Sequence, residues 1–415
     1  MPSTAIDLER LRALLDGINQ YGFNSETGGY NRIGYSDADM AARDWLLDQM
    51  KNDGLKVSRD SVYNLFGRYG PETGPSILVG SHTDTVPEGG GFDGSLGVAV
   101  ALECVRTMRD ANLTPEIAVE VVVTAEEEGR FGGMLGSQTI AGTLTREWID
   151  KSRDADGTTL VEAMKVHGLS PYDALGKGRK AEDAVAYLEL HIEQGPVLES
   201  TGQAVGIVHS VAGVRNLRVK FTGKANHSGT TPMNLRADAF AGLARVGAAI
   251  PGIIDRHGGE NTRVTIGKAD LYPNFIHTVP GAAEFVINIR DTDPAIIEAV
   301  REALEAEIGA AAADNNLAFD IAEQSRIEPV KLNTELSELL HQEADRLGLD
   351  ARSMPSGAGH DAQTMQSLCP SALMFIPSRD GVSHSPEEWS DWPDIEKGAN
   401  LMLAALIRLS KADRT

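Results

Sequence analysis

Histidines and acidic residues recur in this sequence directly after short, strongly apolar runs. His82 and Asp84 follow the first run, and three glutamates at positions 126–128 follow the second. His191 closes a third run, and His384 follows a fourth. Imidazole nitrogens and carboxylate oxygens together suit zinc or a similar divalent ion. The pattern therefore indicates a metal site that activates water for hydrolysis.

The apolar runs predict the elements that position these residues. They cover residues 76–80, 117–124, 185–190 and 372–376, and helical patterns such as residues 97–108 separate them. Runs that are apolar on both faces and alternate with helices predict an α/β fold with a mostly parallel sheet covered on both sides. Ligands bind at the carboxyl ends of such strands, so we expect the histidines and acids at one edge of the sheet.

A cluster of five such ligands fits two metal ions better than one. Structural zinc needs only four ligands, and one carboxylate can bridge two ions about 3.5–4 Å apart. A carboxylate beside the ligands can then take a proton from the attacking water. Glu127, next to Glu128, has the position for that role.

Composition excludes several other classes of protein. The chain has 415 residues, which at about 150 residues per domain predicts two or three domains. Lys and Arg number 38 against 60 Asp and Glu, giving a net charge of −22, which argues against nucleic acid and membrane surfaces as partners. Two cysteines and no leader-like or membrane-spanning run predict a cytoplasmic protein.

The middle of the chain has a different pattern of apolar and polar residues. Residues 211–326 predict the order βαββαβ, which is typical of a small two-layer α+β domain. The α/β pattern resumes after it with a helix near residues 336–347. We therefore expect a discontinuous dimetal catalytic domain, residues 1–210 and 327–415, with an inserted domain at 211–326.

Six ordered motifs resemble one enzyme family over nearly the whole chain. The sequence is similar to the metal-dependent amidohydrolases of the M20 peptidase-like group, in the branch of N-carbamoyl-L-amino acid amidohydrolases, allantoate amidohydrolases and β-ureidopropionases. The motifs that carry the resemblance are Gly80-Ser81-His82-Thr83-Asp84-Thr85 with Phe92-Asp93-Gly94, Glu126-Glu127-Glu128-Gly129, His191-Ile192-Glu193-Gln194-Gly195-Pro196, His227-Ser228-Gly229-Thr230-Thr231-Pro232-Met233, Ser356-Gly357-Ala358-Gly359-His360-Asp361-Ala362, and Ser383-His384-Ser385-Pro386-Glu387-Glu388.

The resemblance implies a role for each metal ligand. His82 and His191 bind one ion, and Glu128 and His384 bind the other. Asp93 bridges the two ions. The cofactor is then a pair of divalent ions, zinc first, with Mn²⁺, Co²⁺ or Ni²⁺ as alternatives.

The resemblance also implies the catalytic and substrate-binding residues. Glu127 is the general base, Asp84 is the carboxylate that orients the His82 imidazole, and His227 stabilises the oxyanion. Arg290 binds the substrate carboxylate. Further substrate contacts are Gln194, His277, Gly357, Ala358, Gly359 and His360.

Two departures from the family pattern stand out. His277 takes the place of a substrate-binding asparagine, so the pocket for the substrate head group differs. Arg130 follows Gly129 directly, one residue earlier than in relatives. This shortening leaves open an alternative in which Glu126 is the base and Glu127 the ligand.

The implied activity is hydrolysis of the C–N bond of N-carbamoyl-L-amino acids to amino acid, ammonia and carbon dioxide. Allantoate hydrolysis, or an amidase acting on another N-acyl amino acid, is the alternative. The resemblance implies a small substrate with a carboxylate and a homodimer in which the inserted domain serves as lid and dimerisation surface.

Overall fold

The computed structural model describes residues 4–411, which divide into two compact units. Unit 1 contains the described residues up to His209, Leu332–Met354 and the described residues from Gly359 onward. Unit 2 contains Ser210–Lys331 and Pro355–Ala358. The sequence predicted domain boundaries at 210/211 and 326/327, whereas the chain passes between the units at 209/210 and 331/332. The sequence did not predict that Pro355–Ala358 belongs to unit 2.

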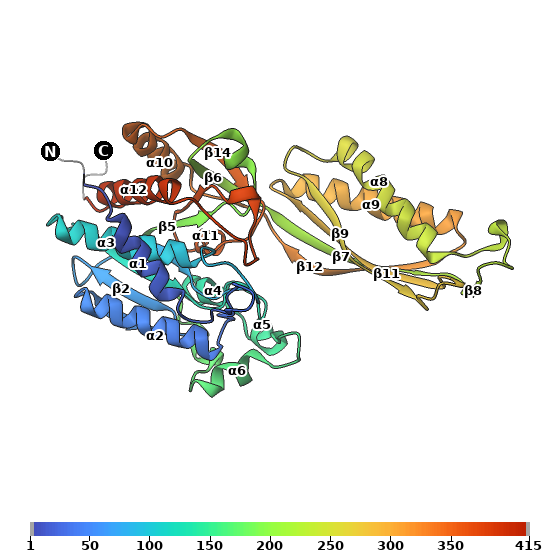
Figure 1. Ribbon diagram of the computed structural model, residues 1–415, viewed down its shortest axis with the longest axis horizontal. Coiled ribbons are helices and arrows are strands. Elements are labelled where there is room, and N and C mark those ends of the chain that lie inside the picture. The colour runs from blue at the N-terminus through green and yellow to red at the C-terminus, as the bar shows by residue number, and fades with distance from the viewer. Residues whose placement is uncertain (1–3, 412–415) are drawn as a thin grey trace. The chain divides into compact units, whose positions relative to one another are not determined.

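The large sheet lies mostly in unit 1 and mixes parallel with antiparallel pairs (Figure 1). Its order is β1-β2-β4-β3-β5-β15-β6-β13, and β14 also pairs with β6. The strands are β1 (Lys56–Arg59), β2 (Leu65–Tyr69), β3 (Ser76–His82), β4 (Ala118–Thr124), β5 (Ala184–Ile192), β6 (Val205–Val211), β13 (Val330–Lys331), β14 (Ala351–Ser356) and β15 (Ser371–Ile376). The central strands β4, β3, β5 and β15 are mutually parallel, and antiparallel strands extend both edges.

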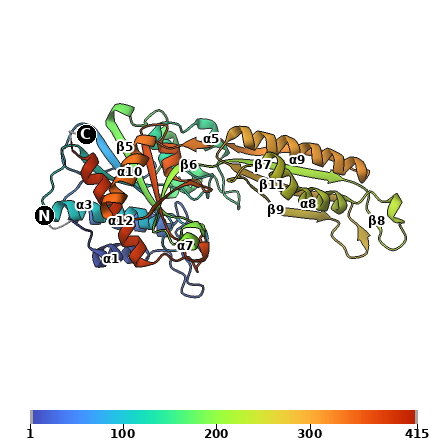
Figure 2. The same ribbon diagram turned by 90° about the horizontal axis from the view of Figure 1, so that it is seen from above.

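Helices cover both faces of this sheet (Figure 2). They are α1 (Leu8–Ile18), α2 (Asp37–Asn52), α3 (Ser95–Asp110), α4 (Leu135–Ala141), α5 (Arg146–Lys151), α6 (Leu160–Val166), α7 (Val197–Thr201), α10 (Thr334–Leu347), α11 (Asp361–Met365) and α12 (Trp392–Leu409). The Leu190 side chain lies beside Gly398 of α12, whereas Glu189 accepts a hydrogen bond from Ala362 N of α11. Adjacent strand residues point to opposite faces, so α11 and α12 lie on opposite sides.

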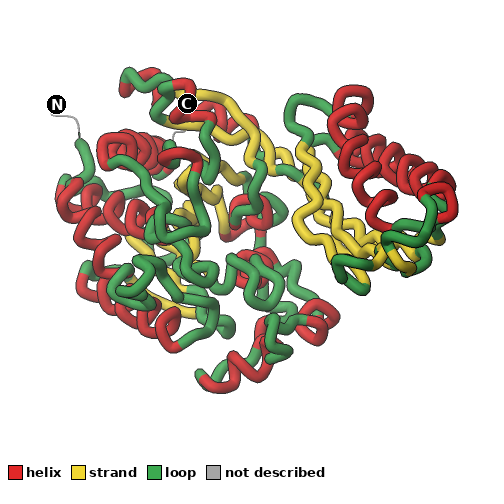
Figure 3. The backbone as a smooth tube through the Cα atoms, turned by 45° about the vertical axis from the view of Figure 1, so that its right-hand side comes forward, coloured by secondary structure: helices red, strands yellow, loops and turns green. Residues whose placement is uncertain are grey.

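Unit 2 is a two-layer α+β unit. Its antiparallel sheet has the order β12-β7-β11-β9, and both long helices cover the same face of it (Figure 3). Its elements are β7 (Gly213–Thr222), β8 (Asn226–His227), α8 (Ala239–His257), β9 (Arg263–Tyr272), β10 (Thr278–Val279), β11 (Ala282–Asp291), α9 (Pro294–Asp314) and β12 (Ala318–Ile327). The expected βαββαβ order is confirmed, and the small β8/β10 ribbon is an addition to it.

Local sequence explains where these elements begin. The runs in β3 and β4 are buried at every position, as central parallel strands require. Asp7, Ser36 and Asp293 cap α1, α2 and α9 by accepting main-chain N–H bonds, and Pro294 occupies the first turn of α9. None of the helices in residues 4–411 is long and apolar enough to cross a membrane.

Candidate metal centre and active site

Four adjacent parallel strands carry the candidate ligands to one edge of the sheet. His82 is the last residue of β3, and Glu127 and Glu128 follow β4. His191 lies near the end of β5, and His384 follows β15. This neighbouring order explains why residues three hundred positions apart meet in one cluster.

The first cluster consists of His82, Asp93 and His191, all buried. The Nε2 atoms of His82 and His191 lie 3.5 and 3.0 Å from Asp93 Oδ1. His82 Nδ1 lies 3.0 Å from the Asp84 main-chain carbonyl, and His191 Nδ1 lies 2.9 Å from that of Ile192. A carbonyl accepts only from an N–H, so each ring carries a proton on Nδ1 and turns Nε2 toward Asp93.

The second cluster shares Asp93 and adds Glu128 and His384. His384 Nε2 lies 3.4 Å from Asp93 Oδ2 and 3.5 Å from Glu128 Oε2. The two oxygens of Asp93 therefore face different clusters. This is the arrangement that a carboxylate bridging two cations requires.

The donor atoms of both clusters fit divalent metal ions. Nitrogen lone pairs and carboxylate oxygens at such short separations repel one another unless positive charge lies between them. Three imidazoles and two carboxylates are the mixed N/O set that zinc and its neighbours accept. The main-chain carbonyls behind His82 and His191 supply the supporting hydrogen bonds that hold metal-binding imidazoles in place.

The raised pKa values of residues in the clusters also indicate that these sites favour bound positive charge. Burial lowers the pKa of His82, but the carboxylates of Glu127 and Asp93 outweigh it and leave that pKa well above its ordinary value. The hydrogen bond to Asp93 is the main reason that the pKa of His384 rises to about 9. Burial, then Asp93, raises the pKa of Glu128 to about 8. Protons and metal ions therefore compete for these atoms.

The structure separates the three consecutive glutamates. Glu127 Oε2 lies 3.5 Å from His82 Nε2, and Glu128 faces His384. Glu126 is fully buried and accepts a hydrogen bond from Phe131 N at 2.6 Å, outside both clusters. The geometry therefore favours Glu127 and Glu128 over the alternative pair Glu126 and Glu127.

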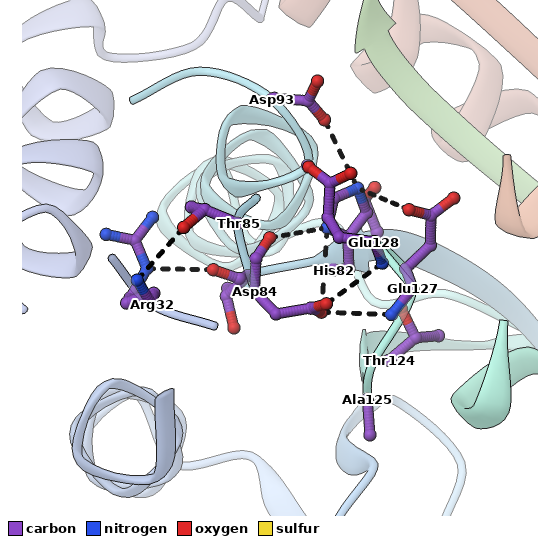
Figure 4. Close-up of polar contacts among 12 residues, drawn as sticks. Arg32, His82, Asp84, Thr85, Asp93, Thr124, Ala125, Glu127 and Glu128 are labelled. Atoms are coloured by element: carbon purple, nitrogen blue, oxygen red, sulfur yellow. Dashed lines mark hydrogen bonds and ion pairs between the residues drawn. The ribbon is translucent and has the colours of Figure 1, made fainter. Parts of the chain in front are cut away.

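Asp84 contacts both the His82 imidazole and the main chain of the neighbouring glutamates (Figure 4). The His82 imidazole bonds the Asp84 main-chain carbonyl, while its Nδ1 lies 3.8 Å from Asp84 Oδ1. The same carboxylate also accepts hydrogen bonds from Glu127 N at 3.2 Å and Glu128 N at 3.1 Å. Asp84 thus holds the main chain of the two working glutamates, because the turn after β4 points its N–H groups at that carboxylate.

Two supporting residues were missing from the expected site. Glu388 Oε1 accepts from Phe92 N and Asp93 N, both at 3.0 Å, and its Oε2 accepts from His384 N at 3.3 Å. It therefore ties two ligand loops together. Arg43 is fully buried, with Nη2 3.8 Å from Asp84 Oδ1. The Ser383–Glu388 motif contained a signal for Glu388, whereas an arginine inside an ordinary helical pattern gives none.

Backbone strain gathers at this edge of the sheet. Glu126, Gln194 and His384 have φ values of 52°, 57° and 56°, in the left-handed region that L-residues rarely occupy. Gly94, which follows Asp93, has φ 61°. Such residues persist where the surrounding structure fixes them, and they cluster at functional sites.

Two residues expected to contact substrate lie against the clusters. Gln194 donates a hydrogen bond from Nε2 to Asp93 Oδ2 at 2.6 Å. His360 is 2% exposed, and its ring packs edge-on against His191 with centroids 4.6 Å apart. Burial, then the neighbouring His191, holds the pKa of His360 well below its ordinary value. His360 thus packs against the His191 ring, beside the first cluster.

Unit 2 places His227 and His277 on one small ribbon. His227 in β8 pairs with Thr278 in β10, and the His277 carbonyl accepts from Ser228 N at 3.0 Å. His227 Nδ1 accepts from Gly229 N at 3.0 Å and from Thr230 N at 3.3 Å. The ring proton of neutral His227 is therefore on Nε2, which makes that exposed nitrogen a hydrogen-bond donor.

Arg290 is oriented by polar groups without a carboxylate partner. Its Nε donates to Asn288 Oδ1 at 3.0 Å, and its Nη1 donates to the Gly357 carbonyl at 2.6 Å. Asn288 in turn donates to Asn216 at 2.7 Å across the sheet. Burial lowers the pKa of Arg290 from its ordinary value. A half-buried guanidinium with neutral partners retains its charge for an anion. Gly357 and Ala358 belong to unit 2, whereas Gly359 belongs to unit 1.

Comparison with known proteins agrees with this geometry. Residues 78–408 match peptidase family M20/M25/M40. The chain belongs to this family. The chain is 36% identical to an N-carbamoyl-L-amino acid amidohydrolase of Geobacillus stearothermophilus, over 98% of this chain and 99% of the relative. An allantoate amidohydrolase of Escherichia coli is also 36% identical, over 92% and 93% of the two chains.

A solved structure extends the likeness to the whole fold. A hydantoinase/carbamoylase family amidase from Burkholderia multivorans superposes with a TM-score of 0.90 at 33% identity, covering 99% of both chains. The resemblance expected from the six motifs is confirmed. The M20 fold, a large mixed sheet with a separate antiparallel sheet, is also confirmed.

Proposed function

We propose that this M20-family protein is a dimetal amidohydrolase that hydrolyses N-carbamoyl-L-amino acids to the amino acid, ammonia and carbon dioxide. The observation that carries the proposal is the pair of clusters sharing Asp93, with Glu127 beside them. Two divalent ions bound there, zinc first and Mn²⁺, Co²⁺ or Ni²⁺ as alternatives, lower the pKa of water and polarise the substrate carbonyl.

Individual side chains carry out proton transfer, substrate binding and oxyanion stabilisation. Glu127 takes the proton of the attacking water and delivers it to the leaving nitrogen, which breaks the C–N bond. The released carbamic acid then decomposes to ammonia and carbon dioxide. Arg290 binds the substrate carboxylate, and the Nε2–H of His227 donates to the oxyanion. His277, Gln194 and the Gly357–Gly359 backbone complete the substrate site.

The proposed assembly is a cytoplasmic homodimer in which unit 2 serves as lid and dimerisation surface. Large apolar side chains exposed on unit 2 support this, among them Phe240, Tyr272 and Phe319. Light scattering of the purified protein gives the mass in solution directly. A monomer at micromolar concentration contradicts this part of the proposal.

A panel of substrates tests the activity. The purified protein is loaded with Zn²⁺, Mn²⁺ or Co²⁺ and assayed with N-carbamoyl-L-amino acids, N-carbamoyl-β-alanine, allantoate and N-acyl amino acids. We expect the highest kcat/KM with an N-carbamoyl-L-amino acid. Allantoate is the second candidate, because the allantoate amidohydrolase relative is as similar to this chain as the carbamoylase is. Turnover of none of these compounds with any metal contradicts both.

Glutamine substitutions at two neighbouring glutamates test which residue carries the proton. Glu127→Gln removes the proposed base, and we expect kcat to fall by about 10²- to 10⁴-fold. Glu126→Gln is the matched control, because Glu126 is buried outside both clusters, where burial raises its pKa well above the ordinary value. Its amide oxygen can still accept from Phe131 N. Full activity of Glu127→Gln, with loss in Glu126→Gln, supports the other assignment of the glutamates.

A further inference from the structure

A cavity of about 570 Å³ lies in unit 1, lined by side chains other than the five ligands. Its aromatic walls are Tyr30, Phe92, Trp389 and Trp392. The Phe92 ring lies 5.3 Å from Trp389 and 6.3 Å from Trp392, centroid to centroid. A volume of this size and an aromatic lining are typical of small-molecule sites.

Helix α1 presents two opposite charges to this cavity. Arg12 and Asp16 stand one helical turn apart and both line it. Residues at i and i+4 ordinarily pair, yet within residues 4–411 neither makes an ion pair or hydrogen bond. The Arg12 guanidinium instead lies 4.4 Å from the centroid of the Trp392 ring. Both charges therefore remain available to a ligand.

Two polar atoms of the lining are buried without partners. They are Arg12 Nε, a donor, and Asn19 Oδ1, an acceptor. The Asn19 amide is oriented by its own Nδ2, which donates to the Gly91 carbonyl at 2.9 Å. These two atoms are out of reach of solvent, so a molecule in the cavity meets the outer atoms of the same side chains.

The geometry points to a second small-molecule site that binds a free α-amino acid with an apolar side chain. Its carboxylate lies at the outer nitrogens of Arg12, its ammonium group at Asp16, and its side chain between the aromatic walls. A cation such as Arg12 and an anion such as Asp16, both unpaired in one cavity, match a zwitterion better than a singly charged ligand. Such an amino acid is also the product of the reaction proposed above, and that link rests on the proposed function. The binding of the amino acid in this cavity does not depend on the proposed function.

The cavity shares a wall with the metal centre. Phe92 and Glu388 both line it, and Glu388 Oε1 accepts from Phe92 N and from the N–H of the ligand Asp93. A molecule seated in the cavity therefore contacts residues that hold Asp93. The two tryptophans of the wall provide an optical signal for binding.

Calorimetry and tryptophan fluorescence of the metal-loaded full chain test the site. The probe is L-leucine, compared with 3-methylbutylamine, which lacks the carboxylate, and 4-methylpentanoate, which lacks the ammonium group. We expect L-leucine to bind and to change the fluorescence, with each analogue at least tenfold weaker because it loses one charge-assisted contact. Equal binding of either analogue contradicts the zwitterion site.

Matched variants on one helix locate the binding. Arg12→Gln and Asp16→Asn should each weaken L-leucine binding about tenfold or more, whereas Glu9→Gln, on the exposed part of α1, should not. Thermal unfolding shows whether each variant is folded. Binding unchanged in Arg12→Gln and Asp16→Asn, or no binding to the unaltered protein, refutes the site. In either case substrate turnover in the panel assay tests the proposed function separately.

Discussion

A substitution at Gly94 tests whether tight packing against His82 positions that residue in the candidate metal centre. Gly94 follows Asp93, which both clusters share, and is the N-cap residue of α3, with φ 61°. A Cβ at this position would lie 2.4 Å from His82 Cε1 and Nδ1 and 2.5 Å from Nε2. Ordinary contacts of a Cβ begin at 3.4 Å, so the imidazole of Gly94→Ala must move by 3.4 − 2.4 = 1.0 Å.

The expected magnitude follows from that displacement. Moving a reacting group by about 1 Å costs about 10²-fold in rate, and a weakened ligand lowers metal affinity by a similar factor. Alanine at φ 61° and ψ −53°, outside the left-handed helical region, adds about 1–3 kcal/mol of backbone strain. We therefore expect Gly94→Ala to lower kcat/KM about 100-fold and to lose metal during dialysis.

A second alanine separates strain from the clash. Gly54 has φ 75° and nothing within 4 Å of its would-be Cβ, so Gly54→Ala introduces a Cβ at positive φ without a clash. Metal content by mass spectrometry, kcat/KM and Tm are measured for both variants. If Gly94→Ala keeps the metal content and kcat/KM of Gly54→Ala, the packing of Gly94 against His82 does not position that ligand, and the reasoning fails.

Three further predictions concern the surroundings of the site. Asp84→Asn should lower kcat/KM about 10- to 100-fold, because one half of the amide cannot accept from the glutamate N–H groups; unchanged kinetics refute this role. Chelation should abolish activity and lower Tm, and Zn²⁺ should restore both, since ligand binding stabilises the folded state; a Tm insensitive to chelator contradicts it. Arg179→Leu should destabilise unit 1 by about 3 kcal/mol at pH 7, because it leaves Glu120 buried without its two Arg179 bonds. Burial raises the pKa of Glu120, but the Arg179 hydrogen bonds outweigh burial, and the net effect is a lowered pKa. The ion pair therefore stabilises the folded protein fully at pH values above the ordinary glutamate pKa. This stabilisation is lost as the pH falls through the lowered pKa of Glu120. The Tm difference between Arg179→Leu and the unaltered protein should therefore narrow between pH 7 and pH 3, and a constant difference contradicts the ion pair.

The sequence predicted the parts of the site that follow from strand order. His82, Glu128, His191 and His384 each follow or end a buried parallel strand, and the chain order of such strands limits where their carboxyl ends meet. The inserted βαββαβ unit was likewise visible in its alternation of apolar residues. These features depend on local periodicity, which a single sequence displays.

Features that depend on the path of a loop could not be predicted in this way. The orientation of the Asp84 carboxylate depends on how the main chain turns after β4, and the burial of His360 depends on packing against His191. The β8/β10 ribbon has only two residues in each strand, too few for a periodic signal. Spacing along the chain does not determine any of these.

The place of β15 in the large sheet has a consequence for the synthesis of the protein. Residues 371–376 are synthesised after both β5 and β6, yet this strand lies between them in the interior of the sheet. Until it is made, β5 and β6 expose unpaired edges, which favour aggregation. His384 is made later still, so the second cluster lacks a member until the chain has passed β15.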